Sequence, residues 1–192
     1  DGDSDEIKSL IDTAMQAGVE RNLGHDYLED IEERYSETAR ITSPTPWDII
    51  NEVMQGGLGA GELGVIVAPA GIGKSWVLSA MGAYAISKGL NVVHYTLELN
   101  EAYVGLRYDS VVTGIANQEL KYNVDQVKDT VNNIPGNLII KYYPTKGATI
   151  NTIKSHVEKY KILGKTPDII MLDYADLLRG SSATRGQDLR HE

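Results

Sequence analysis

The chain has 192 residues, no cysteine and a formal net charge of −9. This length allows one domain with a real core and some additional segment, and the lack of cysteine excludes disulfide bonds and thiolate metal sites. The four histidines do not have metal-ligand spacing, no apolar run is long enough to cross a membrane, and the acidic N-terminus is unlike a signal peptide. We therefore expect a soluble protein of the cell interior that does not contact a membrane.

The acidic charge is concentrated near the N-terminus. Residues 1–40 carry twelve acidic and four basic side chains, whereas residues 41–192 carry fifteen acidic and fourteen basic ones. A nucleic-acid-binding surface usually has a basic stripe, and neither part of the chain has one. The nearest candidates for such a stripe are Lys154, Lys159, Lys161 and Lys165. Their spacing is more typical of the solvated face of one helix and the loop after it.

Two helices and a linker are predicted at the start of the chain. Apolar residues recur at helical spacing from Ile7 to Met15, and this short acidic helix packs either on its own domain or on a neighbouring subunit. A second helical pattern, rich in acidic residues, covers residues 27–39. The prolines within residues 41–46 cannot continue a helix, so we expect a linker and a boundary there.

From residue 47 onward, strand and helix patterns alternate. Apolar runs predict strands near 64–68, 90–97, 137–143 and 168–173, and helical periodicity predicts helices near 74–88, 100–114, 123–133 and 149–163. Continuous apolar strands that are separated by helices indicate a parallel sheet covered on both faces. The sequence therefore predicts an α/β fold.

The most informative segment, Ala-Pro-Ala-Gly-Ile-Gly-Lys-Ser, lies between the first predicted strand and the helix after it. A strand, a glycine-containing loop and a helix form an anion nest of backbone N–H groups, as in nucleoside triphosphate sites. The residues expected to bind the nucleotide are Ala68, Pro69, Ala70, Gly71, Ile72, Gly73, Lys74 and Ser75. Lys74 would reach the β- and γ-phosphates, and the Ser75 hydroxyl would bind Mg²⁺. Ala68 replaces the usual first glycine of this pattern. The alternative to a nucleotide site is an ordinary strand-to-helix turn that happens to contain Gly-Lys-Ser.

Two carboxylates follow predicted strands. Asp173 ends the strand 168–173, and Glu98 follows the strand 90–97. The carboxyl ends of buried parallel strands face the crevice in which ligands bind. Asp173 would hold Mg²⁺ directly or through water, and Glu98 would orient the attacking water or accept its proton. In the alternative reading, both carboxylates only cap the segments that follow them.

Four ordered motifs together resemble the RecA-type ATPase domain of the DnaB family of replicative helicases. They are residues 57–63, 68–75, 95–99 and 168–178. The family also accepts alanine at the first loop position, its S-L-E-M strand end is similar to residues 96–99, and its D-Y-x-x-x-L motif matches the run from Asp173. Residues 138–148 are similar to the T-even phage branch. The resemblance covers residues 41–192 and implies a RecA-like P-loop NTPase core, with a mainly parallel sheet flanked by helices.

The resemblance also implies roles for individual residues. By position, Lys74 and Ser75 bind phosphate and magnesium, Asp173 is the acid of the magnesium strand, and Glu98 is the catalytic carboxylate.

Two further residues were considered as secondary contacts. Arg107 matches an arginine that follows the S-L-E-M segment in the family, although a surface arginine paired with Glu101, Asp109 or a neighbour is the favoured interpretation. Trp76 lies where it could stack on adenine, although packing in the core is favoured.

A division of the chain follows from the same resemblance. Residues 1–40 take the place of an acidic helical linker that docks on the next subunit. Residues 41–192 are an ATPase domain that ends before the family's glutamine-bearing strand, DNA-binding loops and arginine finger. We therefore expect a C-terminally truncated motor domain of a phage-type replicative DNA helicase, weakly active by itself. The whole protein would hydrolyse ATP or another NTP with Mg²⁺ and move along single-stranded DNA as a ring, expected to be a hexamer.

The expected partners are single-stranded DNA, bound mostly through regions outside this chain, further copies in the ring, and a primase and a helicase loader as candidates. The expected location is the cytoplasm, that of the host if the protein is phage-encoded. Two other functions stay open: a recombinase or clock-type ATPase of the same fold, and a non-hydrolytic nucleotide-sensing assembly module. Residues 97–99 and 174–176 argue against the recombinase and the clock-type ATPase.

Overall fold

The structure is a computed structural model that describes residues 7, 26–36 and 41–179. The chain divides into two compact units, Asp1–Arg40 and Ile41–Glu192. In the first unit, helix α2 (Ile31–Ser36) lies within the range predicted to be helical. The helix predicted around residues 7–15 lies outside the described residues, except for Ile7.

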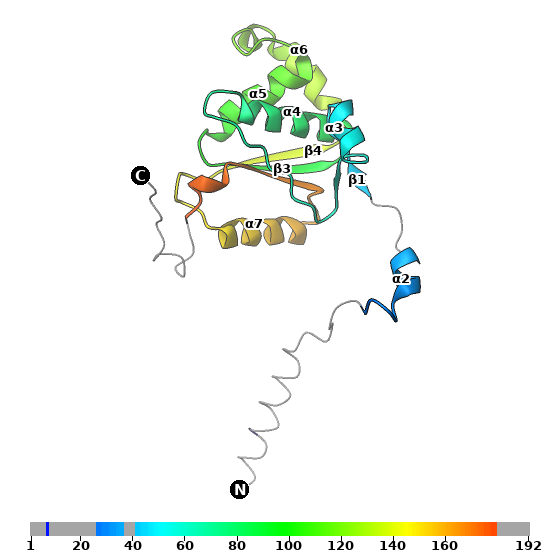
Figure 1. The fold of residues 1–192 in the computed structure, drawn as a ribbon. Helices are drawn as coiled ribbons and strands as arrows, with labels where there is room; N and C mark the ends of the chain where they lie inside the picture. The colour runs from blue at the N-terminus through cyan, green and yellow to red at the C-terminus, as the bar shows by residue number, and fades with distance from the viewer. Residues whose placement is uncertain (1–6, 8–25, 37–40, 180–192) are drawn as a thin grey trace. The chain divides into compact units, whose positions relative to one another are not determined.

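The second unit is built on a sheet of three parallel strands (Figure 1). Strand β3 (Asn91–Thr96) is central, and β4 (Asn137–Tyr142) and β5 (Ile169–Asp173) flank it. Thr96 lies opposite both the last residue of β4 and Asp173, the last residue of β5. All three strands therefore end at the same edge of the sheet, and their bounds agree closely with the predicted strands.

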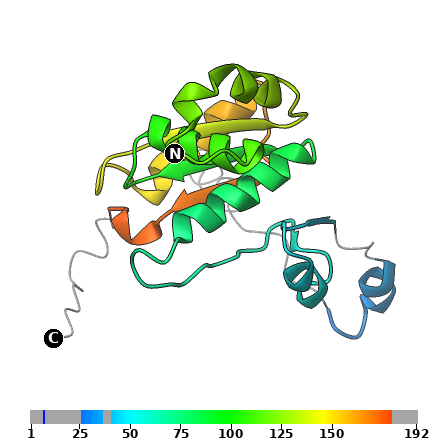
Figure 2. The ribbon, with the colours of Figure 1, turned by 90° about the horizontal axis from the view of Figure 1, so that it is seen from above.

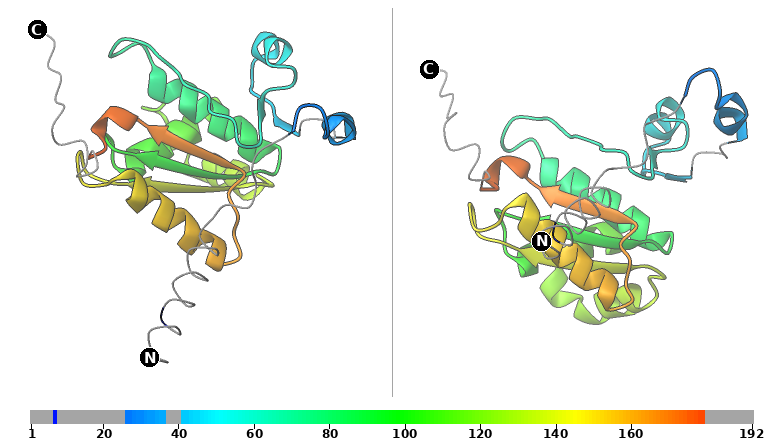
Figure 3. Two further views of the ribbon diagram at one scale, coloured as in Figure 1. Left: turned by 60° about the horizontal axis from the view of Figure 1, so that its bottom comes forward. Right: turned by 90° about the horizontal axis from the view of Figure 1, so that it is seen from below.

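Helices cover both faces of this sheet (Figure 1). Helices α4 (Lys74–Ser87) and α5 (Glu101–Thr113) lie on one face, with α6 (Val124–Asn132) packed on α5. Helix α7 (Ile150–Ile162) lies on the other face, as both views of Figure 3 show. All four helices were predicted from their periodicity. None of the helices in the described part of the chain is long and apolar enough to cross a membrane.

Because successive strand residues point to opposite faces, each face has its own apolar cluster. The cluster under α4 and α5 consists of Ala83, Ala85, Ile86, Val92, Val104, Tyr108 and Met171. The cluster under α7 consists of Val93, Tyr95, Ile153, Val157 and Tyr160. Side chains of β3 point alternately to the two faces, so this one buried strand contributes residues to both clusters.

The predicted linker at 41–46 is more structured than expected. Strand β1 (Thr42–Ser43) pairs antiparallel with β2 (Leu58–Gly59), and helix α3 (Asp48–Val53) lies between them in sequence. A Cβ at Gly57, where φ is +110°, would lie 2.2 Å from the carbonyl oxygen of Ser43, so only glycine allows this approach. Two-residue strands have no periodicity to detect, which is why the sequence did not reveal them.

The strand predicted near 64–68 does not form. Residues 62–69 have no regular secondary structure and lead as a loop into α4 (Figure 2). Val65 is 71% exposed and Val67 is 89% exposed, although both belong to the apolar run that predicted a buried strand. An apolar run becomes a strand only when a neighbouring strand accepts its backbone hydrogen bonds, and no described strand pairs with it.

Two short 3₁₀ helices complete the described fold. They are η1 (Leu120–Tyr122), between α5 and α6, and η2 (Ala175–Leu177), which follows β5. The latter lies beside the loop between β4 and α7, because the Lys146 N–H donates to the Leu177 carbonyl at 2.8 Å.

Candidate nucleotide and magnesium site

Chain connectivity places the start of α4 at the carboxyl edge of the sheet. Only residues 88–90 separate the end of α4 from β3, so the helix runs antiparallel to the strand. The helix has 14 residues and the strand six, so both are roughly 20 Å long. The start of α4 therefore lies at the sheet edge where β3 and β5 end (Figure 2). Lys74 and Ser75 are the first residues of α4, Asp173 ends β5, and Glu98 follows β3. The fold brings the four predicted residues to one edge.

Glycines set the shape of the loop before α4. Gly71 has a φ of +79°, and Gly73, which is the N-cap of α4, has a φ of +105°. Nothing lies within 4 Å of a Cβ built at either position, so backbone conformation and not space selects glycine. No side chain caps the helix start. The first amides of α4 therefore point out of the helix without a capping side chain, as an anion-binding end requires.

Lys74 is folded back over this loop. Its Nζ donates hydrogen bonds to the carbonyl oxygens of Ala68, at 2.6 Å, and Pro69, at 3.1 Å. The backbone carbonyl of Ser75 accepts a hydrogen bond from the Ser79 hydroxyl at 2.9 Å. The Ser75 hydroxyl takes no part in this hydrogen bond. The loop thus holds the ammonium group beside the helix start, where an anion would meet both.

Asp173 fits a metal-binding role. It is 3% exposed, and its carbonyl oxygen accepts the N–H of Leu97 at 2.9 Å. No hydrogen bond or salt bridge joins its side chain to another described residue. A buried carboxylate is costly unless a partner compensates its charge, and carboxylate and hydroxyl oxygens are ligands that Mg²⁺ prefers. The side chains of Ser75 and Asp173 therefore fit the ion that the sequence suggested.

Glu98 is exposed just beyond β3, in a turn held by the Thr96 hydroxyl, which donates to the carbonyl of Leu99 at 2.7 Å. The alternative that Glu98 caps the following helix is wrong, because the N-cap of α5 is Asn100. The Asn100 side chain accepts the N–H of Tyr103 at 3.0 Å. Glu98 is thus not used by the fold as a helix cap.

Arg107 and Trp76 differ from the favoured expectations. Trp76 is 41% exposed, so it is not a core residue. The Arg107 guanidinium lies over its ring, 5.5 Å from the centroid. Glu101 pairs with Lys141 at 3.4 Å and not with Arg107, whose Nη1 is buried without a hydrogen-bond partner among the described residues. The arginine therefore joins α5 to the start of α4.

His94 lies in β3 and is 1% exposed, and no sequence motif marked it as part of a functional site. Its Nδ1 is 2.9 Å from the hydroxyl of Tyr108. Burial lowers the pKa of His94 to about 4, while the charge of Asp173 raises this pKa and that of Arg107 lowers it. The ring is therefore within electrostatic reach of the Asp173 carboxylate. A polar residue within an otherwise apolar run was the signal that could have revealed it.

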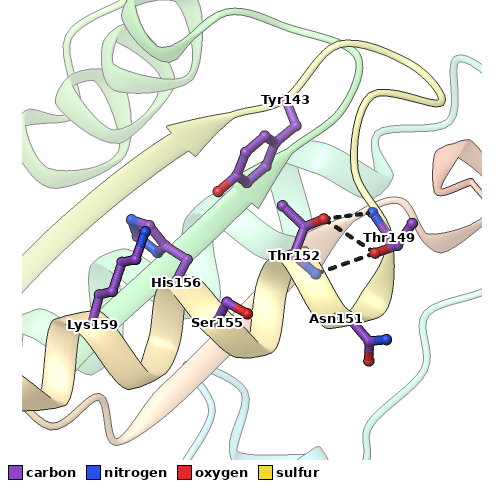
Figure 4. A pocket seen from close by; sticks show the side chains of 7 residues that line it. All are labelled: Tyr143, Thr149, Asn151, Thr152, Ser155, His156 and Lys159. Carbon is purple, nitrogen blue, oxygen red and sulfur yellow. Dashed lines mark hydrogen bonds between the residues drawn. The ribbon is translucent and has the colours of Figure 1, made fainter.

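A hollow of about 430 Å³ opens on the α7 face of the sheet (Figure 4). The residues that line it are Tyr143, Thr149, Asn151, Thr152, Ser155, His156 and Lys159. None of the predicted nucleotide or magnesium residues is among them, so the hollow is separate from the candidate site.

Comparison with known proteins gives consistent results. The family model described as DnaB-like helicase C terminal domain matches residues 44–191. A DnaB-like replicative helicase of Enterobacteria phage T4 is 27% identical over 184 residues, which cover 90% of this chain and 39% of that protein. A solved structure of a DnaB-like replicative helicase, described together with its interactions with primase, is similar in fold. Its TM-score is 0.63 at 18% identity, covering 92% of this chain and 44% of the other. The chain thus spans less than half the length of these relatives.

Proposed function

Because the chain belongs to the DnaB-like helicase C-terminal domain family, we propose that residues 41–192 are part of the ATP-hydrolysing motor of a phage-type replicative DNA helicase. One observation carries the proposal: the uncapped start of α4, with Lys74 and Ser75, lies at the same sheet edge as Asp173 and Glu98. This edge combines donors for phosphate oxygens with carboxylates for a metal ion and for water.

The residues at this edge have separable roles in hydrolysis. The backbone N–H groups of residues 70–75 bind phosphate oxygens, and Lys74 exchanges the loop carbonyls for the β- and γ-phosphates. Ser75 and Asp173 hold Mg²⁺, which neutralises charge on the phosphates when bound. Glu98, exposed beside them, orients the attacking water or accepts its proton.

An arginine supplied by a neighbouring subunit completes the site, since such residues contribute a factor of about 10³–10⁵ where they have been measured. Residues 1–40 act as the acidic segment that docks on the next subunit of a ring, proposed to be a hexamer. Single-stranded DNA is bound mostly through other parts of the protein. A primase and a helicase loader are the candidate partners, in the cytoplasm of a host cell if the protein is phage-encoded.

The proposal is tested in a longer protein that contains this chain, by replacing Glu98 with Gln. We expect ATP hydrolysis to fall by a factor of about 10² or more while ATP binding is kept, because only the proton acceptor is removed. Glu101→Gln is the matched control: it removes a carboxylate at the same edge that bonds the Tyr142 N–H at 3.0 Å, and it should leave hydrolysis within about two-fold.

Two outcomes would point to the other functions. Undiminished hydrolysis in the Glu98→Gln protein would show that the catalytic assignment is wrong. ATP-dependent assembly without hydrolysis in the unmodified protein would favour a nucleotide-sensing module. The family model favours the helicase over a recombinase or a clock-type ATPase.

A further inference from the structure

Strand β3 carries two histidine–tyrosine hydrogen bonds, a buried one on one face of the sheet and a partly buried one on the other. On the α5 side, the Nδ1 of His94 is 2.9 Å from the hydroxyl of Tyr108. On the α7 side, the hydroxyl of Tyr95 is 2.8 Å from the Nδ1 of His156. The rings meet edge to face in both pairs, with centroids 5.8 Å and 5.6 Å apart. Chemically the two pairs are alike, so their surroundings must decide whether they differ in function.

We propose that the His94–Tyr108 pair positions the magnesium-binding side chains Ser75 and Asp173 relative to each other, whereas the Tyr95–His156 pair only stabilises the fold. This inference rests on the proposed function, because it assigns positioning residues to the same site. Neither His94 nor Tyr108 is proposed to touch the nucleotide.

The hydroxyl of Tyr108 lies at a junction of helices and strands. It donates to the Met171 sulfur of β5 at 3.9 Å and contacts His94 of β3. A Cβ at Gly82 of α4 would lie 2.1 Å from the same hydroxyl, so the tyrosine tip lies directly against the helix backbone. One hydroxyl of α5 therefore contacts α4, β3 and β5. Because buried groups are close-packed, this contact sets how far α4 lies from the two strands.

This junction is connected to the site along both strands and along α4. His94 and Met171 lie opposite each other in register, and Asp173 lies two residues beyond Met171. Side chains two residues apart in a strand share a face, so Asp173 lies on the same face as the junction. Gly82 is seven residues, or about 10 Å of helix, after Ser75. A displacement of α4 at Gly82 would thus change the separation of Ser75 from Asp173.

The pair acts through hydrogen bonding and packing, because His94 is neutral near pH 7, its pKa being lowered to about 4 by burial. Its Nε2 is buried and has no hydrogen-bond partner among the described residues. Tyr108 is therefore the polar contact that the structure shows for this ring. Loss of the tyrosine hydroxyl would leave both ring nitrogens without a partner.

The other pair has no such connection. His156 lies on α7 and joins this helix to β3, and the ring of Tyr143 stacks on Tyr95 with centroids 6.2 Å apart. His156 and Tyr143 line the hollow in Figure 4, away from the start of α4. Tyr95→Phe is therefore a matched control for Tyr108→Phe, with the same atom removed from the same kind of hydrogen bond.

The experiment compares these two variants in a longer protein that contains the chain. Three quantities are measured: the melting temperature, the Mg²⁺ concentration that gives half-maximal ATP hydrolysis, and ATP affinity with and without Mg²⁺ by calorimetry. Both variants should lower the melting temperature. Only Tyr108→Phe should raise the half-maximal Mg²⁺ concentration, by about three- to ten-fold, and reduce the gain in ATP affinity that Mg²⁺ gives by a similar factor. ATP affinity without Mg²⁺ should change by less than about two-fold.

Equal Mg²⁺ responses of the two variants would overturn the inference. So would a Tyr108→Phe protein whose melting temperature falls while its Mg²⁺ requirement stays unchanged. If Tyr108→Phe does not fold, His94→Asn and His94→Leu replace it. The asparagine amide can still form a hydrogen bond with the Tyr108 hydroxyl, whereas leucine cannot, so only His94→Asn should keep the low Mg²⁺ requirement. Equal values for the two proteins would contradict the inference. An unmodified protein without Mg²⁺-dependent hydrolysis would overturn the proposed function and this inference together. If the unmodified protein is active, the comparison of the variants tests this inference alone.

Discussion

Helices α4 and α7 both begin at the carboxyl edge of the sheet, yet their first turns differ. At the start of α7, Thr149 and Thr152 form a capping box: the Thr149 hydroxyl accepts the N–H of Thr152, and the Thr152 hydroxyl accepts the N–H of Thr149, both at 3.2 Å. At the start of α4, the N-cap is Gly73, and no side chain caps the helix. The two helix dipoles point the same way, so capping decides which amides remain available to a ligand.

The first amides of α7 are bonded by side chains of the same helix start, whereas those of α4 have no capping side chain and are left for the proposed phosphate. Lys74 belongs to the α4 end, and Asp173 supplies the neighbouring carboxylate.

Replacing Lys74 with Ala should weaken ATP binding by about 10- to 100-fold, because a charge-assisted hydrogen bond to phosphate is lost. The measurement is ATP titration in a calorimeter. Lys154→Ala, in the early part of α7, is the control and should leave the affinity unchanged within about two-fold. An equal loss in both variants would erase the contrast between the helix starts.

Replacing Gly82 with Ala should lower the free energy of unfolding by about 1–3 kcal/mol, because the new methyl group would overlap the Tyr108 hydroxyl. Urea unfolding measures this change. The control is Gly105→Ala in α5, where the nearest atom to the added Cβ is 4.0 Å away, and it should stabilise the helix by up to about 1 kcal/mol. A Gly82→Ala protein as stable as the unmodified one would show that α4 can move away from the tyrosine.

Acidification should destabilise the protein through His94, which is buried, and His156, which is partly buried. The pKa of His94 is lowered from 6.5 to about 4 by burial, and the pKa of His156 is also lowered by burial. The unfolded state therefore binds the proton first as the pH falls, and the free energy of unfolding decreases between about pH 6.5 and pH 4. From pH 7 to pH 5, His94 should account for about 1–2 kcal/mol of this loss.

Unfolding curves at both pH values, for His94→Asn and His156→Asn, separate the two faces of the sheet. We expect the His94 variant to lose more of the pH dependence, since His94 is the more deeply buried. The reverse order would place the acid-sensitive group on the α7 face.

Replacing Thr149 with Ala should cost about 1 kcal/mol of stability, because the capping box of α7 loses one member. ATP affinity should stay the same, since this helix end is not proposed to bind phosphate. Thermal unfolding and ATP titration of the same sample measure both quantities. A change in affinity would mean that α7 contributes to the site after all.

Several elements could be predicted because their signals are local. Helix α4 ends just before Gly89, whose φ of +86° suits the residue after a helix, and the predicted end was correct. The buried run of β3 was equally clear. The prediction of a strand near 64–68 was wrong because an apolar run does not show whether a partner strand is present to accept its hydrogen bonds. The expectation that Trp76 packs in the core was wrong for a similar reason, since helical spacing does not say which neighbours cover a side chain. Its contact with adenine stays a prediction.

Residue types and their spacing were enough to predict the Gly-Lys-Ser loop, the order of α4 to α7 and β3 to β5, and the resemblance to the family that the comparisons then showed. These depend on residue type and spacing along the chain. Only the tertiary structure decided that α4 starts beside Asp173, that Asn100 and not Glu98 caps α5, and that His94 meets Tyr108 beneath the site. Such contacts join residues distant in the chain, and close packing, which no local pattern encodes, selects them.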